Sequence, residues 1–328
     1  MRDWLETLSS VDRYSGKQLG TGQKLASEGQ DWRRTYGRWF RILIGVSRLG
    51  VAAVLFLAVF SFVHPIGDSF SVVQVPVAIF GLLLCVVSFG VVFRFLALVM
   101  SMLALGQVAM AFLSSTGAGP VSVYQKNLLH LNKTAPRVTS DIMAREVGVV
   151  TLQEVTEGLF RSIASDLGGA YPTRVFCPYN PNRGSAVFSQ WQAVDGSAFC
   201  AREGNMSGVQ VETPHGVLWL VSLHLHWPWP YEQGEQVAEL VADISRLDGP
   251  VILGGDFNMV PWSNSVAIVE VATGGERAGG VAPTFYLGDI PLPIDHVMAP
   301  GGGTIEVLPK FGSDHHGLLA RVHPVIRP

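Results

Sequence analysis

The chain has 328 residues, 48% of them hydrophobic and only 15% charged, with a mean hydropathy of +0.32. This composition excludes an ordinary soluble protein, and the apolar excess is concentrated between Ile42 and Leu113. The formal net charge of −3 excludes a global basic field that would attract nucleic acid, although a local basic groove remains compatible with it.

The first 41 residues are mixed and polar, and basic and aromatic side chains gather at their end. These side chains are Arg33, Arg34, Arg38, Arg41, Trp32, Tyr36, Trp39 and Phe40. The pattern is typical of an interfacial anchor on the cytoplasmic side of a membrane, whereas the part before Gly29 indicates a solvated tail. A cleaved signal peptide is not indicated, because its charged region and apolar core would lie much closer to the start.

Three apolar stretches follow: Ile42–Val63, Val72–Phe93 and Phe95–Leu113. The first is long enough to span a bilayer. The other two together are too long for one span, so we expect a tight turn between them at Arg94. Residues 42–113 are therefore predicted to form three transmembrane helices. For Val72–Leu113 the alternative is a single span followed by a re-entrant or surface helix, which would leave two spans in all.

Basic residues predict the orientation of these spans. The arginines before the first span and Arg94 should lie on one side of the membrane, and the loop Val63–Ser71 has no Lys or Arg. The positive-inside rule then places the N-terminus in the cytoplasm and the C-terminal domain outside; with two spans the domain would be cytoplasmic. The linker Ser114–Pro120 reaches at most about 25 Å, which keeps the domain at the membrane surface.

From Val121 to the C-terminus, short strand patterns alternate with helical ones. Strands are predicted at Val121–Gln125, Val147–Leu152, Ala186–Phe188, Val209–Val211, Leu218–Leu223, Val251–Leu253, Ile294–Met298 and Leu318–Val322. Helices are predicted at Thr139–Glu146, Glu157–Leu167 and Gln233–Leu247. Residues 121–328 are therefore expected to form one two-layer or sandwich α/β domain.

Two of the three cysteines, Cys177 and Cys200, fall in this domain, and Cys85 lies in an apolar stretch where packing is its expected role. In an oxidising compartment the pair could form a disulfide. Two unpaired thiols are the open alternative, because the sequence does not give the separation of the two residues.

The stretch Val251–Asn258 carries the strongest chemical signal. A buried strand is followed by Gly254 and Gly255, which remove side-chain bulk where the chain is expected to leave the sheet. Asp256 and Asn258 are two residues apart, so both point to the same side of an extended chain. A carboxylate that takes a proton from water and an amide that donates to a phosphate oxygen suit phosphate chemistry. The alternative is a capped turn after a core strand.

Further polar residues stand at or after the ends of predicted strands. They are Asn127, Glu154, His224, Asp295 with His296, and Asp314 with His315 and His316. In this order, these short motifs resemble those of the endonuclease/exonuclease/phosphatase superfamily, which includes pancreatic deoxyribonuclease, abasic-site endonuclease and neutral sphingomyelinase. The resemblance covers about Val121 to Val322 and implies a mixed α/β (α+β) fold, a four-layer αββα sandwich.

The resemblance also implies a metal site. Glu154 corresponds to the family's main ligand for Mg²⁺ (or Mn²⁺), with Asn127 beside it and Asp314 close to the ion. From the residues alone, Glu154 could instead be an acid at the start of a helix. At Leu129 the chain lacks the second acidic ligand of abasic-site endonucleases, which disfavours close kinship with DNA repair enzymes.

Catalytic roles follow from the same resemblance. Asp256 would orient the attacking water, and Asn258 would bind a phosphate oxygen. His315 would contact the scissile phosphate, with Asp295 as the carboxylate that orients its ring. His224 would be a second phosphate-facing histidine.

Three local features modify this assignment. His226 has the same strand face as His224, so the second histidine could be two residues further on. The family often has Ser-Arg where this chain has Ser189-Gln190, and Arg183 is a candidate substitute for the missing cation. The aromatic segment Trp227–Tyr231 is expected to rim the site and to reach the lipid head groups; a rigid loop packed on the domain is the alternative.

These features predict a membrane-anchored, Mg²⁺-dependent phosphoesterase of the bacterial plasma membrane, with its domain on the periplasmic or extracellular side. Expected substrates are a lipid-linked phosphate, pyrophosphate or phosphodiester, because lipid head groups reach a tethered site by two-dimensional diffusion. Three spans followed by this domain resemble bacterial membrane proteins linked to teicoplanin resistance, which implies undecaprenyl pyrophosphate as one such substrate. The alternatives are a surface-tethered endo- or exonuclease and, less favoured, a non-catalytic interaction domain.

Overall fold

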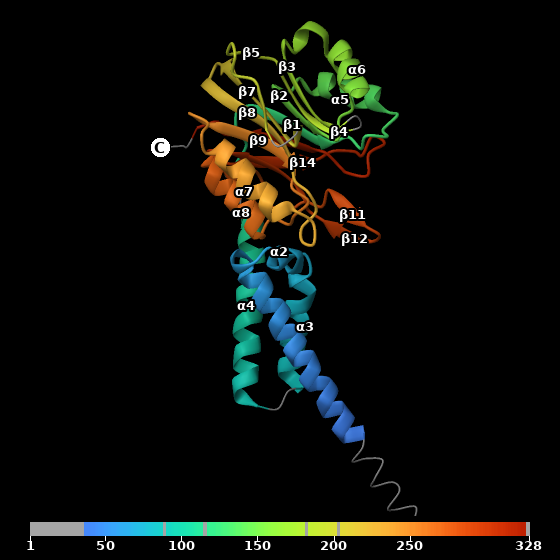
Figure 1. The fold of residues 1–328 in the computed structure, drawn as a ribbon, viewed down its shortest axis with the longest axis vertical. Coiled ribbons are helices and arrows are strands. Elements are labelled where there is room, and N and C mark those ends of the chain that lie inside the picture. The colour runs from blue at the N-terminus through green and yellow to red at the C-terminus, as the bar shows by residue number, and fades with distance from the viewer. Residues whose placement is uncertain (1–35, 88–89, 114–116, 181–182, 202–203, 326–328) are drawn as a thin grey trace, which may run out of the picture.

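The computed structural model describes residues 36–87, 90–113, 117–180, 183–201 and 204–325, and it has two parts (Figure 1). Apolar helices form a stalk, and the rest of the described chain forms a sandwich of β-sheets at one end of it. Residues 1–35 of the predicted cytoplasmic segment 1–41 lie outside the described residues.

Sheet A has the strand order β14-β15-β1-β2-β4-β3. Its strands are β1 (Val121–Asn127), β2 (Val149–Gln153), β3 (Thr173–Asn180), β4 (Arg183–Ser189), β14 (Gly303–Val307) and β15 (Leu318–Val322). β1 and β2 are parallel, with Asn127 opposite Gln153. This register brings Asn127 and the residue after β2, Glu154, to the same edge of the sheet.

Sheet B has the strand order β10-β13-β9-β8-β7-β5, and β6 also pairs with β7. Its strands are β5 (Gln192–Ala193), β6 (Phe199–Ala201), β7 (Met206–Thr213), β8 (Gly216–His224), β9 (Val251–Asp256), β10 (Glu276–Arg277) and β13 (Asp295–Ala299). In the register, His224 of β8 and Asp295 of β13 both stand opposite Asp256 of β9. Three predicted site residues therefore form one row across three neighbouring strands.

Helices cover the outer face of each sheet, so the domain has four layers. They are α5 (Ala135–Arg145) and α6 (Glu157–Leu167) on sheet A, and α7 (Gln233–Ile244) and α8 (Asn264–Thr273) on sheet B. Between the sheets, aliphatic side chains form a third buried core. Burial of these apolar faces is what holds the layers together, and the result is the mixed α/β sandwich predicted from the sequence.

Some local predictions need correction. α8 and β3 were not predicted, and the strand β9 continues through both glycines, so the prediction that Gly254 and Gly255 mark its end is wrong. A Cβ on Gly254 would lie 2.3 Å from Thr151 Oγ1 of the opposite sheet, and one on Gly255 would lie 2.3 Å from the Leu223 carbonyl oxygen. The glycines therefore permit close packing and allow β9 to carry Asp256 within the strand.

Three apolar helices form the stalk: Tyr36–Val59, α3 (Gln74–Val87) and α4 (Val91–Leu113). The first helix and α4 are long and apolar enough to cross a membrane, whereas α3 has only 14 residues. Among the described residues, two of the three predicted spans thus have membrane length. The predicted turn at Arg94 is wrong, because α4 begins earlier and Arg94 N donates to Gly90 O at 3.2 Å, inside the helix.

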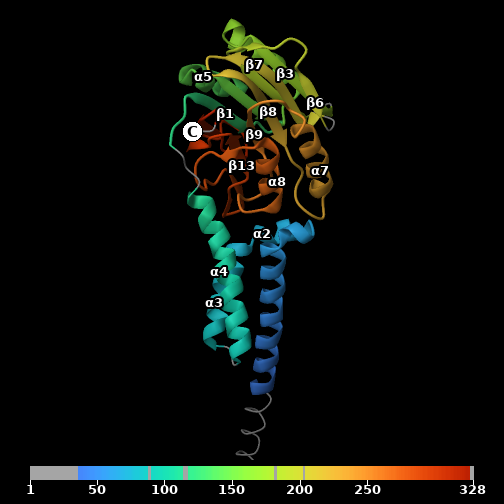
Figure 2. The same ribbon diagram turned by 90° about the vertical axis from the view of Figure 1, so that its left-hand side faces the viewer.

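The three helices run side by side, and the end of α3 and the start of α4 lie at the end of the stalk far from the sandwich (Figure 2). Gln74 Nε2 of α3 donates to the Ala104 carbonyl oxygen and to Gln107 Oε1 of α4, both at 2.9 Å. Gln107 Nε2 in turn donates to Val59 O of the first helix at 3.3 Å. Such polar links between apolar helices are typical of packing in a lipid environment.

The segment between the first helix and α3 lies against the sandwich (Figure 1). It contains η1 (Ser61–Val63) and α2 (Ile66–Ser71). Asp68 Oδ1 accepts a hydrogen bond from Asn264 N at 2.8 Å, and its Oδ2 accepts from Ser265 N at 3.0 Å and from Ser265 Oγ. Trp262 Nε1 donates to Ser71 O at 2.9 Å. Asp68 therefore binds the exposed amide groups of the α8 N-terminus and fixes the sandwich on the stalk.

Asp68→Ala should lower the free energy of unfolding by about 1–3 kcal/mol, because buried donors at the start of α8 lose their acceptor. The thermal unfolding temperature of the full-length protein in detergent would measure this change. Asp289→Ala, at an exposed turn, is the matched control. Equal unfolding temperatures for the two variants would contradict the assigned role of Asp68.

The end of α4 also contacts the sandwich. Arg277 Nη2 of β10 donates to Ala111 O at 3.0 Å. Residues 114–116 of the predicted linker lie outside the described residues, but Gly119 N donates to Arg321 O of β15 at 3.0 Å. The stalk and the sandwich are therefore joined by packed contacts at both α2 and α4.

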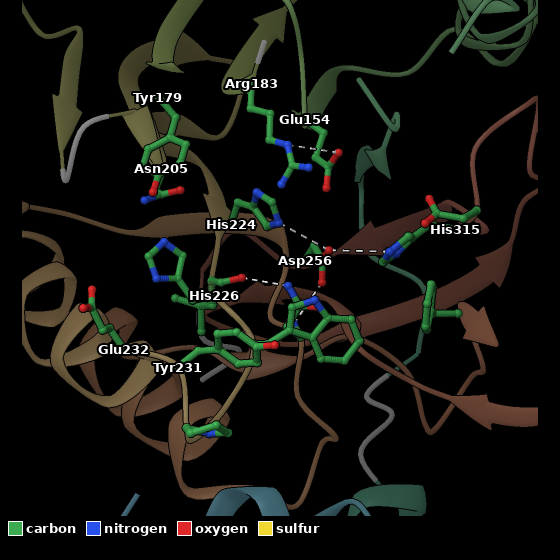
Figure 3. Close-up of a pocket in the computed structure, with 16 residues that line it drawn as sticks. Glu154, Tyr179, Arg183, Asn205, His224, His226, Tyr231, Glu232, Asp256 and His315 are labelled. Atoms are coloured by element: carbon green, nitrogen blue, oxygen red, sulfur yellow. Dashed lines mark hydrogen bonds and ion pairs between the residues drawn. The ribbon is translucent and has the colours of Figure 1, made fainter. Parts of the chain in front are cut away.

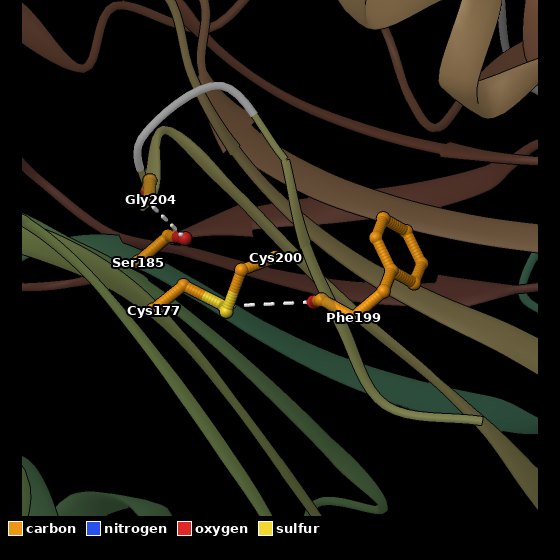
Figure 4. The surroundings of a disulfide bond; sticks show 5 residues. All are labelled: Cys177, Ser185, Phe199, Cys200 and Gly204. Atoms are coloured by element: carbon orange, nitrogen blue, oxygen red, sulfur yellow. Dashed lines mark hydrogen bonds between the residues drawn. A yellow bond between two sulfur atoms is a disulfide. The ribbon is translucent and has the colours of Figure 1, made fainter. Parts of the chain in front are cut away.

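A disulfide joins the two sheets (Figure 4). Cys177 of β3 in sheet A is bonded to Cys200 of β6 in sheet B, with their Cα atoms 5.5 Å apart. Of the two alternatives left open by the sequence, the structure has the disulfide. Its presence is typical of a domain in an oxidising compartment.

Candidate active site

A pocket of about 470 Å³ opens where strands of both sheets end (Figure 3). Six of the eight site residues predicted from the sequence line it: Glu154, His224, Asp256, Asn258, Asp314 and His315. The other two, Asn127 and Asp295, hydrogen-bond to residues of this set. The fold thus brings together side chains that are far apart in the sequence.

Asp256 is at the centre of the cluster, with only 1% of its surface exposed. Its Oδ2 lies 3.6 Å from His224 Nε2 and 3.7 Å from His315 Nε2, and it accepts a hydrogen bond from Asn127 Nδ2 at 2.9 Å. Burial raises the pKa of Asp256 above its usual value, although the two histidines oppose this shift. A carboxylate with a raised pKa is better matched to accepting a proton near neutral pH.

His315 and Asp295 form a buried pair beside Asp256. His315 Nδ1 lies 2.8 Å from Asp295 Oδ2, and Gln125 Nε2 donates to the other Asp295 oxygen at 2.8 Å. Burial alone would lower the pKa of His315, but the charges of Asp295 and Asp256 outweigh it and raise this pKa to about 10. His315 is therefore an imidazolium whose Nδ1–H donates to Asp295 and whose Nε2–H is directed toward the pocket.

Backbone strain marks two of these residues. Glu154 and Asn258 both adopt positive φ angles, 54° and 50°, in the left-handed region that side chains other than glycine rarely occupy. Asn258 N donates to Asp256 Oδ1 at 2.9 Å, and Asn258 Nδ2 donates to Leu225 O at 2.8 Å. Such strain is typical of functional sites, where the surrounding structure fixes the side-chain position.

The carboxylate of Glu154 lies at the pocket wall beside a histidine and an arginine side chain. Its Oε2 lies 3.0 Å from His130 Nδ1 and 3.9 Å from the Arg183 guanidinium. Burial opposes ionisation of Glu154, but these contacts keep its pKa below the usual value. Arg183 therefore reaches the site. It is the residue expected to replace the arginine that the family often has after the serine at position 189. His130 was not predicted, and its only sequence signal is its place three residues after Asn127.

The pocket suits a hard divalent cation. The carboxylates of Glu154, Asp256 and Asp314 all line it, and oxygen ligands of this kind are those that Mg²⁺ prefers. Ligand atoms of Asp256, Asp295 and His315 also lie within 4.8 Å of one another. In that trio the Asp295–His315 hydrogen bond already explains the short distances, so we retain Glu154 and Asp314, with Asn127, as the predicted ligands.

Of His224 and His226, His224 is the one whose ring lies beside Asp256, with its Nε2 3.6 Å from Asp256 Oδ2. His226 lines another part of the pocket and contacts the ring of Tyr179, with centroids 6.1 Å apart. Aromatic rings form the rim. Trp227 and Tyr231 line the pocket and are 41% and 64% exposed, and Phe285 packs on His315 with ring centroids 4.9 Å apart.

A model of the endonuclease/exonuclease/phosphatase family matches residues 125–315, which is more than half of the chain. The protein therefore belongs to the endonuclease/exonuclease/phosphatase family, whose members are metal-dependent hydrolases of phosphoester bonds. The matched region contains every predicted site residue. No curated protein matches the chain by sequence.

Solved structures share this fold at low sequence identity. TDP2 from D. rerio, complexed with a single-strand DNA product, matches with a TM-score of 0.51 at 16% sequence identity. The match covers 61% of this chain and 97% of the TDP2 chain. Beta toxin from Staphylococcus aureus with bound magnesium ions has a TM-score of 0.50 at 12% identity, with 62% and 99% covered. A family member from Bacteroides vulgatus has a TM-score of 0.50 at 15% identity, with 61% and 97% covered.

Proposed function

We propose that this protein is a membrane-anchored, Mg²⁺-dependent phosphoesterase that hydrolyses a lipid-linked phosphate, pyrophosphate or phosphodiester at the outer face of the membrane. The observation that carries this proposal is the buried Asp256 between two histidines, in a pocket that also holds Glu154 and Asp314. A base, phosphate-binding cations and oxygen ligands for a metal are the three requirements of phosphoester hydrolysis.

In the proposed reaction, Asp256 accepts a proton from water, and the water oxygen forms the new bond to phosphorus. The bond from phosphorus to the leaving oxygen breaks, and the leaving group departs with that electron pair. The His315 imidazolium and an N–H of Asn258 donate hydrogen bonds to the non-bridging oxygens. A Mg²⁺ ion held by Glu154 and Asp314, with Asn127, would supply charge stabilisation, in line with the magnesium bound by the beta toxin.

The position of the pocket favours a lipid substrate. The aromatic segment Trp227–Tyr231 borders the pocket and also contacts the top of the stalk, where Ser69 Oγ donates to Trp229 O at 2.6 Å. Phe62 and Val63, at the end of the stalk, share a small cavity with Trp229. A lipid whose tail lies in the membrane beside the stalk would thus have its head group near the pocket.

The proposed orientation rests on charge and on the disulfide. Arg48 lies over the ring of Phe93 at 4.7 Å, and Phe93 and Arg94 are both in the first turn of α4. Both arginines are therefore at the stalk end far from the sandwich, as the positive-inside rule expects of the cytoplasmic side. The Cys177–Cys200 disulfide favours the opposite, oxidising side for the sandwich.

Trp227→Ala together with Trp229→Ala should lower turnover of a vesicle-borne lipid phosphate about tenfold or more, because exposed indole rings anchor at the membrane interface. Turnover of bis(p-nitrophenyl) phosphate in detergent should fall by a smaller factor. The ratio of the two rates is the measurement, with Trp191→Phe, which lies away from the pocket, as the control. Equal losses on both substrates would argue for a packing role of the loop instead.

A substrate panel tests the proposal itself. Purified full-length protein with Mg²⁺ would be assayed on vesicles that carry a lipid monophosphate, a lipid diphosphate or a lipid phosphodiester, and on plasmid DNA. We expect hydrolysis of at least one lipid and none of the plasmid. Cleavage of the plasmid alone would replace this proposal with the tethered nuclease.

A further inference from the structure

Gln233 of α7 joins the two segments that carry catalytic residues. Its side chain is buried, and its Nε2 donates hydrogen bonds to His226 O and, at 3.1 Å, to Phe257 O. His226 lies two residues after His224 of β8, and Phe257 directly follows Asp256 of β9. Both hydrogens of one amide group are thus used to hold the ends of two neighbouring strands relative to each other.

A second glutamine of α7 holds the same loop after β8. The side chain of Gln236 is fully buried, and its Oε1 accepts a hydrogen bond from His226 N at 2.7 Å. Its Nε2 donates to His224 O at 3.0 Å. The position of His224 therefore depends on α7 as well as on the sheet.

The polar chain continues from Gln233 to the top of the stalk. The hydroxyl of Ser265, the second residue of α8, donates to Gln233 Oε1 at 3.2 Å and to Asp68 Oδ2. Asp68 belongs to α2, which lies directly below α7 and α8 (Figure 2). A serine has one hydroxyl hydrogen, so the two acceptors share it and their positions are coupled. All three side chains are buried, which strengthens the electrostatic part of these bonds.

These contacts extend further than docking of the sandwich requires. The bonds from Asp68 to the first backbone amides of α8 would be enough to fix the sandwich on the stalk. The bonds between Ser265 and Gln233, and from Gln233 onward, lead instead to the backbone beside the catalytic residues. The stalk also contacts the loop after β8 directly, because Ser69 Oγ donates to Trp229 O at 2.6 Å.

We propose that the stalk is a positioning element of the active site: Asp68, Ser265 and Gln233 form a buried link through which docking on α2 sets the positions of His224 and Asp256. This inference rests on the proposed function, because the rate that the link sets is the rate of that reaction. The three linking side chains line a separate cavity of about 140 Å³ and none of them lines the pocket. They act through the backbone, and hydrolysis depends on how the membrane anchor is packed.

Steady-state kinetics of the full-length protein in detergent, with Mg²⁺ and bis(p-nitrophenyl) phosphate, tests the link. Ser265→Ala should lower kcat about tenfold and Gln233→Met about 10²-fold, because a misplacement of about 1 Å is enough for a loss of this size. KM should stay within about twofold, since both variants keep the residues that line the pocket. The double variant should be no slower than about Gln233→Met alone, because the link is already broken there. Thr273→Val removes a buried hydroxyl at the other end of α8 and is the matched control, with an unchanged kcat.

Hydrogen exchange of the metal-free protein gives a second readout that does not depend on activity. Peptides that cover residues 224–231 and 256–260 should exchange about tenfold faster in Ser265→Ala than in the wild type, because the lost hydrogen bond makes local opening easier. Thr273→Val should exchange at the wild-type rate in both segments.

The possible results separate this inference from the phosphoesterase proposal. If the wild type is active and Ser265→Ala keeps its kcat, the link is wrong and the phosphoesterase proposal is unaffected. Additive losses in the double variant, or an equal loss of kcat in Thr273→Val, would also overturn the link. If the wild type hydrolyses neither the soluble ester nor any lipid of the panel, the phosphoesterase proposal fails, and hydrogen exchange alone decides whether the stalk holds the two segments.

Discussion

Asp256→Asn is expected to lower phosphoester turnover by about three orders of magnitude, the middle of the range for loss of a general base. The substitution keeps the size of the side chain and removes its ability to accept a proton. In the wild-type protein both carboxylate oxygens of Asp256 accept hydrogen bonds, from Asn127 Nδ2 and Asn258 N. In the variant one of these donors meets an amide nitrogen, so a modest fall in the unfolding temperature is also expected.

The two effects can be separated by measuring turnover well below the unfolding temperature of the variant. Asp195→Asn, in an exposed turn, is the matched control and should keep wild-type turnover. Retention of more than about a tenth of the activity in Asp256→Asn, at equal folded protein, would exclude Asp256 as the base. It would also exclude the row of His224, Asp256 and Asp295 as the catalytic centre.

His315→Gln and Asp295→Asn form the second prediction. His315→Gln should reduce turnover about 10²- to 10⁴-fold, because it removes the imidazolium that is held toward the pocket. Asp295→Asn should also reduce turnover, since loss of the Asp295 charge lowers the pKa of His315 and weakens its orientation. The 2.8 Å contact between the two side chains implies that they act as a unit.

Residues that act as a unit have non-additive effects, so the double variant should be no slower than about the slower single variant. The measurement is turnover of the two single variants and the double variant in one double-mutant cycle. His215→Gln, in an exposed turn, is the control. Fully additive losses of turnover would contradict a joint action of the two residues and would leave His315 and Asp295 with independent roles.

Much of the candidate site is predictable because its residues follow strands with clear local patterns. Parallel pairing of β1 with β2 and of β8 with β9 places the ends of these strands at common edges. Polar residues at such ends therefore converge. Asp256 is predictable from its own motif, whereas Glu154 and His224 were assigned through the family resemblance, and the structure brings all three to one pocket.

Other features depend on contacts between distant segments and leave no local pattern. His130 belongs to no sequence motif, and its contact with Glu154 Oε2 at 3.0 Å comes only from the fold. Asp68 sits in a short loop between apolar helices, and its role requires the N-terminus of α8, almost 200 residues later. The apolar run Val72–Phe93 has no signal for the end of α3 at Val87, because its apolar character continues into the start of α4 at Val91.

The central claim is that these side chains form one metal-dependent centre that acts on a membrane lipid. The most direct test is phosphate release from vesicles carrying the best lipid of the substrate panel, measured against Mg²⁺ concentration for the wild type and for Glu154→Gln. We predict no release after chelation, full recovery on adding Mg²⁺, and a Mg²⁺ requirement at least about tenfold higher in Glu154→Gln. Release that persists under chelation, or an unchanged Mg²⁺ requirement in Glu154→Gln, would contradict the claim.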